Sequence, residues 1–449
     1  MATFLKEFSI PEPKMNISVI GVGYVGLATA AVLAELGNDV MAADVDRKKI
    51  DGLNNGVMPI FEPGLKEMVE RNVRENRLKF VSDNKKVIKH GDVIFICVGT
   101  PPKENWEVEL KYVENVAMEI ARNMDSYKVI VHKSTVPVET GDKVRKIIKG
   151  NIKKNIGFDV VSNPEFLREG SAIEDTLHPD RIVIGSDSEK ATGIMKKLYS
   201  PIKAPLIITN IKSAELIKHA SNAFLATKIS FINSVARICE LSGADIEEVA
   251  KGMGYDKRIS RHFLNAGIGY GGSCFPKDSQ AFIKIAENYG YDSKMLKATN
   301  EINEEQKKIF LGKVKKALGS INGKNIAVLG LAFKPDTDDM RFAPSIYIIN
   351  ELKKEGANIR AYDPEAMENA KEVIDGIEFC RDPYEASKGA DALLIITEWS
   401  EFKEMDLKKI KRLLKSPLII DGRNIYDLET MEKKGFRYIS IGRKEVFPK

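Results

Sequence analysis

Short apolar segments alternate with amphipathic segments in the first part of the chain. Residues 15–20 form a short apolar run with β-branched side chains, which predicts a buried parallel strand. A glycine-containing turn and an apolar stretch of helical spacing, residues 27–37, follow this run, and a second apolar segment ends at Asp44. Further strand signals, separated by helix-like stretches, occur at residues 77–82, 92–99, 127–135, 158–165 and 181–186. Strands that alternate with helices predict a doubly wound parallel sheet, so we expect an α/β domain over residues 1–208.

The pattern changes in the middle of the chain. Residues 213–241 contain no Gly or Pro and keep a helical apolar period, which predicts one helix of about 29 residues. Further helical segments are expected near residues 246–251, 279–288 and 295–318, which together make a helical connector, residues 209–318. Strand and helix signals then alternate again, so we expect a second α/β domain over residues 319–449.

The composition excludes several classes of protein. Of 449 residues, 43% are hydrophobic and 30% are charged, which is typical of a globular chain. The 69 Lys and Arg residues against 64 Asp and Glu leave a net charge of +5, too small to indicate a nucleic-acid partner. No apolar run approaches the roughly 20 residues of a membrane helix, and the N-terminus lacks the apolar core of a secretory signal. We therefore expect a soluble, cytoplasmic protein of several domains.

Cysteines and histidines are few and scattered along the chain. The four cysteines form neither the spacing of a disulfide framework nor a CxxC metal motif. The five histidines never pair at the spacing of metal ligands. We expect no metal site, and we interpret each histidine as structural.

The turn after the first predicted strand matches the pattern G-x-G-x-x-G. Gly21 permits the tight turn, Gly23 lets the backbone approach a pyrophosphate, and Gly26 lets the helix pack closely on the strand. The start of the helix then offers N–H groups and a positive dipole end to phosphates. Asp44 ends the next strand, where a carboxylate accepts hydrogen bonds from an adenosine ribose and disfavours a 2′-phosphate, although Lys49 just beyond it bears on the same choice. The pattern predicts a Rossmann-type NAD-binding domain rather than a glycine turn without a ligand.

The second α/β domain repeats the order of strand, glycine turn, helix, strand and acidic residue. Its turn has a single glycine, Gly330, and therefore does not predict a second dinucleotide site. Lys334 and the start of the next helix still offer positive charge to a phosphorylated ligand.

A glycine-rich loop carries the cysteine with the most unusual surroundings. Residues 267–278 read GIGYGGSCFPKD, and four glycines so close together cost backbone entropy unless something needs to approach the chain closely. An isolated cysteine is usually a small buried apolar residue, which is how we interpret Cys97, Cys239 and Cys380. Cys274 follows the glycines directly, so it could be either such a residue or a catalytic nucleophile.

Polar residues on the long helix and at two strand ends form a second group of candidates. Lys218 and Asn222 are spaced i,i+4, so they share one face of the helix among largely apolar neighbours. An enclosed lysine needs a partner or a function, whereas on a solvated face both residues would be unremarkable. Glu165 and Thr135 each follow a predicted strand, at the sheet edge where α/β proteins bind ligands, although each taken singly could be structural.

Seven motifs together resemble one known family. They read GVGYVG, VGTPP, KSTVPV, SNPEFLREGSAIEDTLHPDRIVIG, ELIKHASNAFLATKISFINS, GIGYGGSCFPKD and GLAFKPDTDDMR, in the order of the UDP-glucose/GDP-mannose dehydrogenases. The resemblance runs from Asn16 to Arg423 and leaves out residues 1–14. The form GGSCFPKD is similar to the branch that acts on UDP-glucose, because the branch that acts on UDP-N-acetylmannosamine usually carries His where this chain has Ser273.

The resemblance implies an activity and an architecture. Members of this family oxidise the primary alcohol of a nucleotide sugar to a carboxylate with two NAD+ per turnover, here UDP-glucose to UDP-glucuronate, a step of polysaccharide biosynthesis. It implies an NAD-binding domain, a central domain that carries the contact of a homodimer, and a C-terminal domain that holds the nucleotide of the substrate.

The resemblance also implies roles for the candidate catalytic residues. Cys274 would form a thiohemiacetal with the aldehyde and then a thioester, because a second hydride leaves only from a tetrahedral carbon. Lys218 and Asn222 would stabilise negative charge on the C6 oxygen. Asp278 would orient water or Lys218.

Further residues are assigned by the same resemblance. Glu165, with Thr135 holding a water, would assist proton transfer and thioester hydrolysis. Cofactor contacts are expected at Gly21, Gly23, Tyr24, Val25, Gly26, Asp44, Lys49, Thr100, Thr135, Glu169, Lys277 and Arg341. Substrate contacts are expected at Glu165, Phe166, Leu167, Arg168, Lys218, Asn222, Phe263, Tyr270, Gly271, Phe333, Lys334, Arg423 and, across the dimer interface, Arg258.

Three alternatives stay open from the sequence. The enzyme could act on a related nucleotide sugar, such as GDP-mannose or a UDP-N-acetylhexosamine. It could be a two-electron dehydrogenase of the hydroxyacid type, which also carries Lys and Asn on a helical domain but needs no cysteine. It could also be an NAD-binding regulator without activity, although the retained Cys274, Lys218 and Asp278 argue against this.

Overall fold

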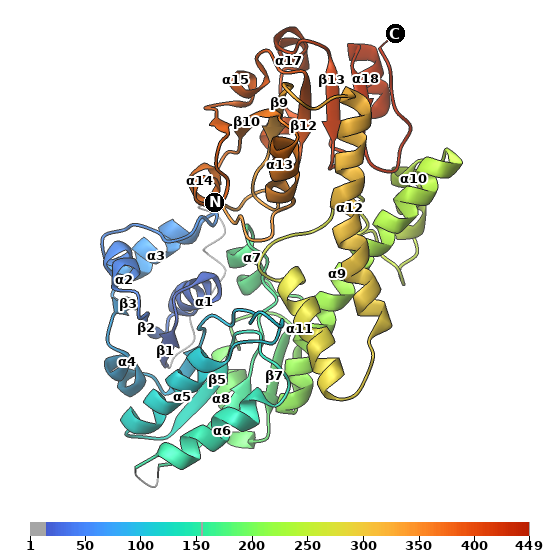
Figure 1. The fold of residues 1–449 in the computed structure, drawn as a ribbon. Helices are drawn as coiled ribbons and strands as arrows, with labels where there is room; N and C mark the ends of the chain where they lie inside the picture. Colours follow the sequence, from blue (N-terminus) through green and yellow to red (C-terminus); the bar gives the residue numbers. More distant parts are fainter. Residues whose placement is uncertain (1–14, 154–155, 449) are drawn as a thin grey trace. The chain divides into compact units, whose positions relative to one another are not determined.

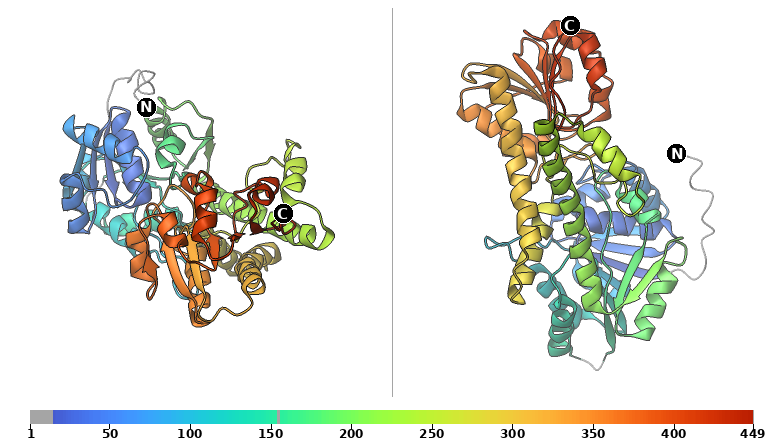
Figure 2. Two further views of the ribbon diagram at one scale, coloured as in Figure 1. Left: turned by 90° about the horizontal axis from the view of Figure 1, so that it is seen from above. Right: turned by 90° about the vertical axis from the view of Figure 1, so that its right-hand side faces the viewer.

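The computed structural model describes residues 15–153 and 156–448. Residues 1–14, which none of the sequence motifs covers, lie outside the described residues. By its internal contacts the chain divides into two compact units, Met1–Ser221 and Asn222–Lys449. Figures 1 and 2 colour the described residues along the sequence, from blue near the N-terminus to red near the C-terminus.

The described part of the first unit contains an eight-stranded sheet in the order β3-β2-β1-β4-β5-β6-β7-β8. Its neighbouring strands are parallel except β6 and β7, which run antiparallel. The strands are β1 (Asn16–Ile20), β2 (Asp39–Ala43), β3 (Leu78–Val81), β4 (Val93–Ile96), β5 (Lys128–His132), β6 (Phe158–Ser162), β7 (Ile182–Ser186) and β8 (Leu206–Thr209). The doubly wound α/β class predicted from the sequence is confirmed.

Helices lie on both faces of this sheet (Figure 1). They are α1 (Tyr24–Glu35), α2 (Arg47–Asn54), α3 (Leu65–Arg74), α4 (Asn84–His90), α5 (Lys111–Asn123), α6 (Thr140–Asn151), α7 (Ala172–Leu177) and α8 (Glu189–Leu198). Successive residues of a strand face opposite sides, so Val93 and Phe95 pack into one core with α1 and α3, whereas Ile94 and Ile96 pack into a second core with α5 and α6. The strands are therefore nearly continuous apolar runs, as burial on both faces requires.

The described part of the second unit contains a six-stranded parallel sheet in the order β11-β10-β9-β12-β13-β14. Its strands are β9 (Asn325–Leu329), β10 (Asn358–Tyr362), β11 (Glu378–Phe379), β12 (Ala392–Ile395), β13 (Leu418–Asp421) and β14 (Arg437–Ile439). Its later helices are α13 (Pro344–Lys354), α14 (Met367–Val373), α15 (Pro383–Ser387), α16 (Ser400–Lys403), α17 (Leu407–Leu413) and α18 (Leu428–Lys434). The same alternation sends Ile326 and Val328 into one core and Ala327 and Leu329 into the other.

In the described chain, four helices lie between the last strand of the first sheet and the first strand of the second. They are α9 (Ile211–Ser242), which crosses from the first unit into the second, α10 (Ile246–Gly254), α11 (Phe275–Asn288) and α12 (Lys294–Leu318). The long helix predicted over residues 213–241 is confirmed. Helices α9 and α12 lie side by side (Figure 2), and the Ser230 hydroxyl donates to the Thr299 carbonyl at 2.7 Å. Helix α11 begins four residues before the predicted segment, because Pro276 fits in its first turn and does not break it.

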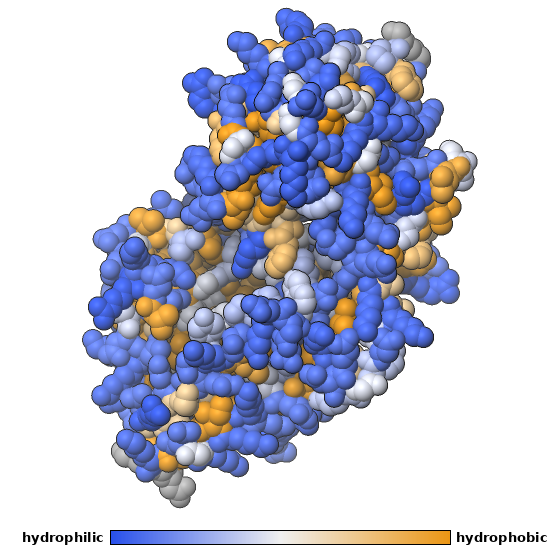
Figure 3. All heavy atoms as spheres, in the orientation of Figure 1, coloured by the Kyte–Doolittle hydropathy of each residue, from blue (hydrophilic) through white to orange (hydrophobic). Residues whose placement is uncertain are grey.

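The face of the molecule seen in Figure 3 is mostly hydrophilic, because the large apolar side chains fill the cores around the two sheets. None of the helices within the described ranges has the length and apolarity needed to span a bilayer.

The glycine turn of each unit faces an aspartate at the end of the next strand. Asp44 accepts from the Val22 N–H at 2.9 Å and the Asp46 N–H at 3.0 Å. Asp363 is fully buried, and its carboxylate accepts from the backbone N–H groups of Leu331, Ala332, Glu365 and Ala366 and from the Trp399 indole N–H. Each aspartate therefore binds its own glycine turn, Asp44 through one backbone donor and the more deeply buried Asp363 through two.

We expect Asp363→Ala to lower the free energy of unfolding by about 3 kcal/mol or more, because several buried donors lose their acceptor together. Asp44→Ala is the matched control, and its loss should be about 1 kcal/mol because the Asp44 carboxylate is partly exposed. Urea unfolding, followed by tryptophan fluorescence, measures the free energy of unfolding of each variant. Trp399 reports on the second unit, because its indole N–H donates to Asp363. Equal losses in the two variants would contradict the assignment.

Candidate active site

The glycine turn before α1 is shaped by close contacts of the chain with itself and by one open position. Gly21 has φ +99°, and a Cβ there would lie 2.7 Å from the Cys97 carbonyl oxygen. A Cβ on Gly26 would lie 1.8 Å from the Gly21 oxygen, so this residue must stay a glycine for the helix to pack. A Cβ on Gly23 meets no described atom within 4 Å. Gly23 also begins the helix, so open space lies beside the N–H groups that would bind a pyrophosphate.

The two side chains predicted to meet the adenosine ribose lie together. The Lys49 ammonium is 3.6 Å from the Asp44 carboxylate, which also accepts the Val22 N–H of the glycine turn. This arrangement keeps a carboxylate at the end of β2 beside the turn. A carboxylate in this position fits NAD, because it could accept hydrogen bonds from the ribose of such a cofactor.

Tyr24 ties the glycine turn to a buried carboxylate that sequence reasoning missed. The Tyr24 hydroxyl donates to Glu62 at 2.6 Å. Glu62 also accepts from the N–H groups of Gly170, at 2.6 Å, and Ala172, at 2.7 Å. The segment that carries Glu169, itself buried, is therefore bound to the turn. No local pattern indicates Glu62, because its backbone partners lie about a hundred residues further along the chain.

A buried ion pair lies where β6 ends. The Lys218 ammonium of α9 is 2.9 Å from one Glu165 carboxylate oxygen, and the residues are 3% and 7% exposed. The other carboxylate oxygen accepts the Leu167 N–H at 2.8 Å. The Phe166 ring lies under the Lys218 ammonium at 5.4 Å and under the Arg181 guanidinium at 3.6 Å. The expectation that an enclosed Lys218 needs a partner is confirmed, since both oxygens of its partner are engaged.

Helix α9 also holds the loop that follows β5. His219 hydrogen-bonds the Val136 carbonyl at 2.9 Å, and Thr135, directly before it, accepts the Thr100 hydroxyl at its carbonyl at 3.0 Å. The loop after β4 and the loop after β5 are therefore joined, next to the helix that carries Lys218. The sequence analysis interpreted His219 as structural. Its hydrogen bond to the Val136 backbone agrees with that interpretation.

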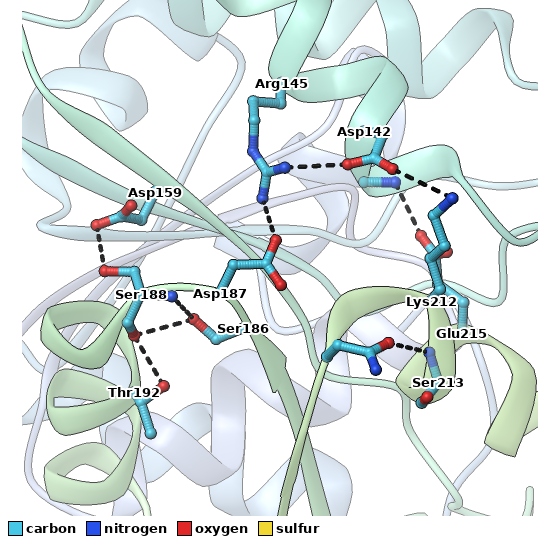
Figure 4. Close-up of polar contacts among 12 residues, drawn as sticks. Asp142, Arg145, Asp159, Ser186, Asp187, Ser188, Thr192, Lys212, Ser213 and Glu215 are labelled. Carbon is cyan, nitrogen blue, oxygen red and sulfur yellow. Dashed lines mark hydrogen bonds and ion pairs between the residues drawn. The ribbon is translucent and has the colours of Figure 1, made fainter.

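A second buried carboxylate binds the end of this loop. Glu215 accepts from the N–H groups of Glu139 and Gly141, each at 2.8 Å, at the start of α6. Glu139 has φ +78°, a left-handed conformation that costs energy in a residue with a side chain, so the bond from Glu215 helps to hold a strained position. Figure 4 shows Glu215 beside Lys212, whose ammonium faces Asp142 of α6.

In the second unit, Cys274 stands at the N-terminal end of α11. Asp278 lies one turn later, is 1% exposed, and accepts the Asn222 side-chain amide at 2.6 Å. The Lys277 ammonium lies 2.7 Å from the other oxygen of Asp278. The predicted residues Asn222 and Lys277 therefore lie in one cluster around the buried Asp278. A helix N-terminus favours the thiolate form of a cysteine placed there.

The other cysteines are buried thiols. Burial raises the pKa of Cys97 to about 12 and that of Cys380 to about 11. Burial also raises the pKa of Cys239. All four cysteines lie within the described residues, and no disulfide joins any of them. Cys274 differs from the other three in being only partly buried.

The chain itself occupies the space that the glycine-rich loop makes available. A Cβ on Gly271 would lie 2.3 Å from the Phe342 carbonyl oxygen, and one on Gly272 would lie 2.6 Å from the Phe333 ring. Arg423, from the turn after β13, donates to the Gly269 carbonyl at 3.0 Å. The close approach inferred from the sequence is therefore made by residues 333–342 and by Arg423.

Aromatic side chains continue the same surface of the second unit. The rings of Tyr270 and Phe263 meet the Phe275 ring edge to face, with centroids 5.7 and 6.1 Å apart. The Lys334 ammonium lies 5.5 Å from the ring centroid of Phe333. These predicted substrate residues come together around the start of α11.

Three arginines predicted to contact ligands form ion pairs within the chain. Arg258 is 89% exposed and pairs with Asp256. Arg341 pairs with Asp339, and Arg168 pairs with Asp175. Each arginine pairs with an acidic residue nearby in sequence. To contact a ligand, the guanidinium would have to break this ion pair or bind the carboxylate and the ligand together.

These features define a class of protein. A glycine turn at the start of a helix and an aspartate at the end of the next strand form a Rossmann-type dinucleotide site, and a buried Lys–Glu pair lies at the same sheet edge. A second α/β unit carries a partly buried thiol at a helix start. This combination is that of a nucleotide-dependent dehydrogenase.

Comparison with known proteins extends this assignment. Three sequence profiles of the UDP-glucose/GDP-mannose dehydrogenase family match, for its NAD binding domain at residues 15–203, its central domain at residues 212–305 and its UDP binding domain at residues 327–428. The chain belongs to this family. It is an NAD-dependent oxidoreductase with a binding domain for the UDP part of a substrate.

Named relatives are similar over nearly the whole chain. The UDP-glucose 6-dehydrogenase TuaD of Bacillus subtilis (strain 168) is 52% identical over 432 residues, which cover 96% of this chain and 94% of that protein. A UDP-glucose 6-dehydrogenase of Rhizobium meliloti (strain 1021) is 49% identical over 440 residues, with coverage of 96% and 100%. The solved structure of a UDP-glucose dehydrogenase from the archaeon Pyrobaculum islandicum matches with a TM-score of 0.90 at 36% identity, with coverage of 96% and 98%.

The buried Glu215 predicts a pH dependence of stability. Burial raises the pKa of Glu215 to about 7, Asp142 raises it further, and the two backbone donors and Lys212 only partly oppose these effects. Between about pH 4.5 and 7 the folded chain therefore holds a proton that the unfolded chain has lost, so stability falls as pH rises through this window.

We expect wild-type protein to lose about 3 kcal/mol between pH 5 and pH 8 relative to Glu215→Gln, whose side chain does not titrate. Calorimetric unfolding of both proteins across this range measures the difference. Melting temperatures that change in parallel with pH in the two proteins would contradict the assignment.

Proposed function

We propose that this chain is a UDP-glucose 6-dehydrogenase that oxidises UDP-glucose to UDP-glucuronate with two NAD+ per turnover. The observation that carries the proposal is the placement of Cys274 at the start of α11, one turn before the Asp278 that Asn222 binds. The similarity of the whole chain to relatives named as UDP-glucose 6-dehydrogenases supports it.

The chemistry follows from the need for a tetrahedral carbon before each hydride leaves. The C6 alcohol loses a proton and a hydride and becomes an aldehyde. The Cys274 thiolate then bonds to C6, and the aldehyde oxygen takes a proton, which gives a thiohemiacetal. Loss of a second proton and hydride leaves a thioester. Water adds to the thioester, the C–S bond breaks, and the carboxylate and the thiolate are released. Bound NAD+ supplies the acceptor for each hydride.

The remaining side chains handle charge and protons in this proposal. Lys218 and Asn222 lie one turn apart on the same face of α9 and would stabilise negative charge on the C6 oxygen. Glu165 would accept released protons, with a water held by Thr135. Asp278 would orient Asn222 and the hydrolytic water, which its 2.6 Å bond to Asn222 supports.

The binding residues divide between the two units. We assign NAD contacts in the first unit to Gly21, Gly23, Tyr24, Val25, Gly26, Asp44, Lys49, Thr100, Thr135 and Glu169, with Lys277 and Arg341 added from the second. We assign substrate contacts to Glu165, Phe166, Leu167, Arg168, Phe263, Tyr270, Gly271, Phe333, Lys334 and Arg423. We also propose three functional parts, namely residues 1–208 for NAD, 209–318 for dimerisation and 319–449 for the UDP-sugar. A cytoplasmic location fits the need to keep Cys274 reduced.

We expect Cys274→Ser to abolish steady formation of two NADH per UDP-glucose, because a serine hydroxyl does not replace the thiolate. Cys380→Ser, which changes a buried cysteine in the second unit, is the control and should retain turnover. NADH absorbance in burst and steady-state assays measures both. Full steady turnover by Cys274→Ser would refute the nucleophile assignment.

The same assay identifies the substrate. NADH yields should be two per molecule for UDP-glucose and near zero for UDP-N-acetylglucosamine, UDP-N-acetylmannosamine and GDP-mannose. A yield of two from another of these sugars with none from UDP-glucose would replace the proposed substrate. One NADH per molecule would indicate a two-electron dehydrogenase, and none from any sugar nucleotide would indicate a regulator without activity.

An exposed apolar stripe on α9 supports a homodimer. Phe224, Phe231 and Ile238 recur every seven residues, so they lie along one side of the helix, and each is at least half exposed. Apolar side chains in such a row are typical of a helix that packs against another chain. In this dimer Arg258, which is exposed near the end of α10, would reach the substrate of the partner subunit.

We expect Phe231→Glu to halve the mass measured by light scattering or sedimentation, because it places a charge in the middle of the stripe. Val373→Glu puts the same charge on another exposed apolar residue and should leave the mass of wild-type protein unchanged. A wild-type protein that is monomeric at micromolar concentration would contradict the dimer.

A further inference from the structure

Side chains bind the backbone of the glycine-rich loop, residues 267–270. These residues lie outside the helices and strands of the described chain. The Tyr270 N–H donates to the Asn303 side-chain oxygen at 2.8 Å, and the Asn303 amide donates to the Tyr270 carbonyl at 3.1 Å. One side chain thus exchanges two hydrogen bonds with one backbone residue, as a neighbouring strand does in an antiparallel pair. Asn303 therefore takes the place of a strand beside Tyr270.

Two further amides bind the other end of the loop. The Gly267 N–H donates to the side-chain oxygen of Asn233, on α9, at 2.9 Å. The side-chain amide of Gln306, on α12, donates to the Gly267 carbonyl at 2.8 Å. Asn233 is fully buried, Gln306 is 1% exposed and Asn303 is 4% exposed. A buried amide is costly unless it is hydrogen-bonded, and the backbone of this loop supplies bonds to all three side chains.

The two amides of α12 occupy positions where a helix is normally apolar. The buried residues Thr299, Asn303, Gln306 and Phe310 follow one another at intervals of three or four, so they share the inward face of the helix. Polar side chains at such positions depart from the hydrophobic pattern, and departures of this kind are expected at functional sites. Holding the glycine-rich loop gives these two amides a function.

A glycine lets the Asn303 amide approach the loop. Gly269 has φ +95°, and a Cβ there would lie 2.7 Å from the Asn303 side-chain oxygen. The turn after β13 binds the loop as well, because the Ile268 N–H donates to the Gly422 carbonyl at 3.0 Å and Arg423 donates to the Gly269 carbonyl at 3.0 Å. Helices α9 and α12 and this turn together fix the path of the loop.

A third amide of α12 connects the loop to the helix that carries Cys274. The Asn300 side-chain oxygen accepts the Tyr270 hydroxyl at 3.1 Å and the Ser279 hydroxyl of α11 at 2.8 Å. The Tyr270 ring also meets the Phe275 ring edge to face. Tyr270 is therefore held by its backbone and by its hydroxyl, and it packs against the residue directly after Cys274.

We propose that Asn233, Asn303 and Gln306 are positioning residues for the glycine-rich loop. Their amides hold the loop in one backbone conformation before the UDP-sugar binds at Tyr270 and Gly271. The inference rests on the proposed function, which assigns those two substrate contacts. Ordering a loop before its ligand arrives removes an entropy cost from binding, and this cost is largest for glycines. The amides act through the loop and have no assigned contact with substrate or cofactor.

The test is Asn303→Leu, which keeps the volume of the side chain and removes both bonds to Tyr270. We expect the Kd for UDP-glucose, measured by calorimetric titration, to rise about tenfold, because the loop must then be ordered during binding. The Kd for NAD+ should stay at the wild-type value, because most contacts assigned to NAD lie in the first unit. An unchanged Kd for UDP-glucose would overturn the proposal. Equal losses of both affinities would assign the effect to the fold and would overturn it too.

Thr299→Val is the matched control. Thr299 lies about one turn before Asn303, is 3% exposed, and its hydroxyl is 3.1 Å from the Thr227 hydroxyl. Valine keeps the shape of threonine and removes a buried hydrogen bond that does not involve the loop. Both affinities should equal those of wild-type protein. A rise of the Kd for UDP-glucose in Thr299→Val as large as in Asn303→Leu would overturn the proposal.

Hydrogen exchange in the ligand-free protein separates this proposal from the proposed function. Mass spectrometry of peptic peptides that cover residues 267–272 measures the exchange of the loop N–H groups. Their exchange should be about tenfold faster in Asn303→Leu than in wild-type protein, and unchanged in Thr299→Val. Wild-type exchange in Asn303→Leu would overturn the positioning role whatever the substrate is. A wild-type protein that does not bind UDP-glucose would instead refute the proposed function.

Gln306→Met provides a second variant if Asn303→Leu does not fold. It nearly keeps the volume of the side chain, removes the bond to the Gly267 carbonyl and leaves both bonds of Asn303 in place. Loop exchange and the Kd for UDP-glucose should therefore change in the same direction by a smaller amount. Wild-type values of both quantities in this variant would overturn the positioning role of the amides.

Discussion

The ion pair between Lys218 and Glu165 is the interaction on which the arrangement of the first unit's site depends. It joins the long helix α9 to the segment after β6, and both groups are almost fully removed from water. Removing two charges from water costs several kcal/mol each, and their attraction repays this only when the remaining hydrogen-bonding capacity is used. The Leu167 N–H on the second oxygen of Glu165 meets part of that demand. A pair of this kind contributes little net stability, which supports a role in chemistry.

Buried carboxylates hold the loops around this pair. Glu62 binds the segment before α7, and Glu215 binds the start of α6. In the second unit Asp363 binds its own glycine turn, and Asp278 is held between Asn222 and Lys277. Glu62, Glu215 and Asp363 accept backbone N–H groups of loops and helix starts, so these segments have defined positions. Asp278 instead joins two side chains. Rigid loops of this kind let side chains far apart in sequence act together.

Much of the fold follows from the sequence pattern. Apolar strands, glycine turns and the absence of Gly and Pro between residues 213 and 241 predicted both sheets and the long helix. Lys218 was singled out because its neighbours on α9 are apolar, and Glu165 because it follows a strand. The start of α11 was placed four residues too late, and Pro276 fits the first turn of this helix.

The residues that the sequence did not indicate have partners distant along the chain. Lys133 meets Asn163 30 residues later, Glu215 meets Gly141 across 74 residues, and Glu62 meets Gly170 across 108 residues. A hydrophobic pattern over a few turns or strand residues cannot indicate such pairs, because they form only when whole helices and strands pack together. The glycines of residues 267–272 show the same limit of sequence reasoning. Their density predicted a close approach to the chain without naming the partner, and the atoms nearest Gly271 and Gly272 belong to Phe342 and Phe333.

The central claim is that the Lys218–Glu165 pair is retained for chemistry and not for stability. The direct measurement compares Lys218→Met, Glu165→Leu and the double variant for free energy of unfolding and for NADH formation from UDP-glucose. Each single variant should lose about 3–5 kcal/mol, because it leaves a buried charge without its partner. The double variant should recover wild-type stability or exceed it, yet form no NADH. A double variant as unstable as the single variants, or one that still turns over UDP-glucose, would contradict the claim.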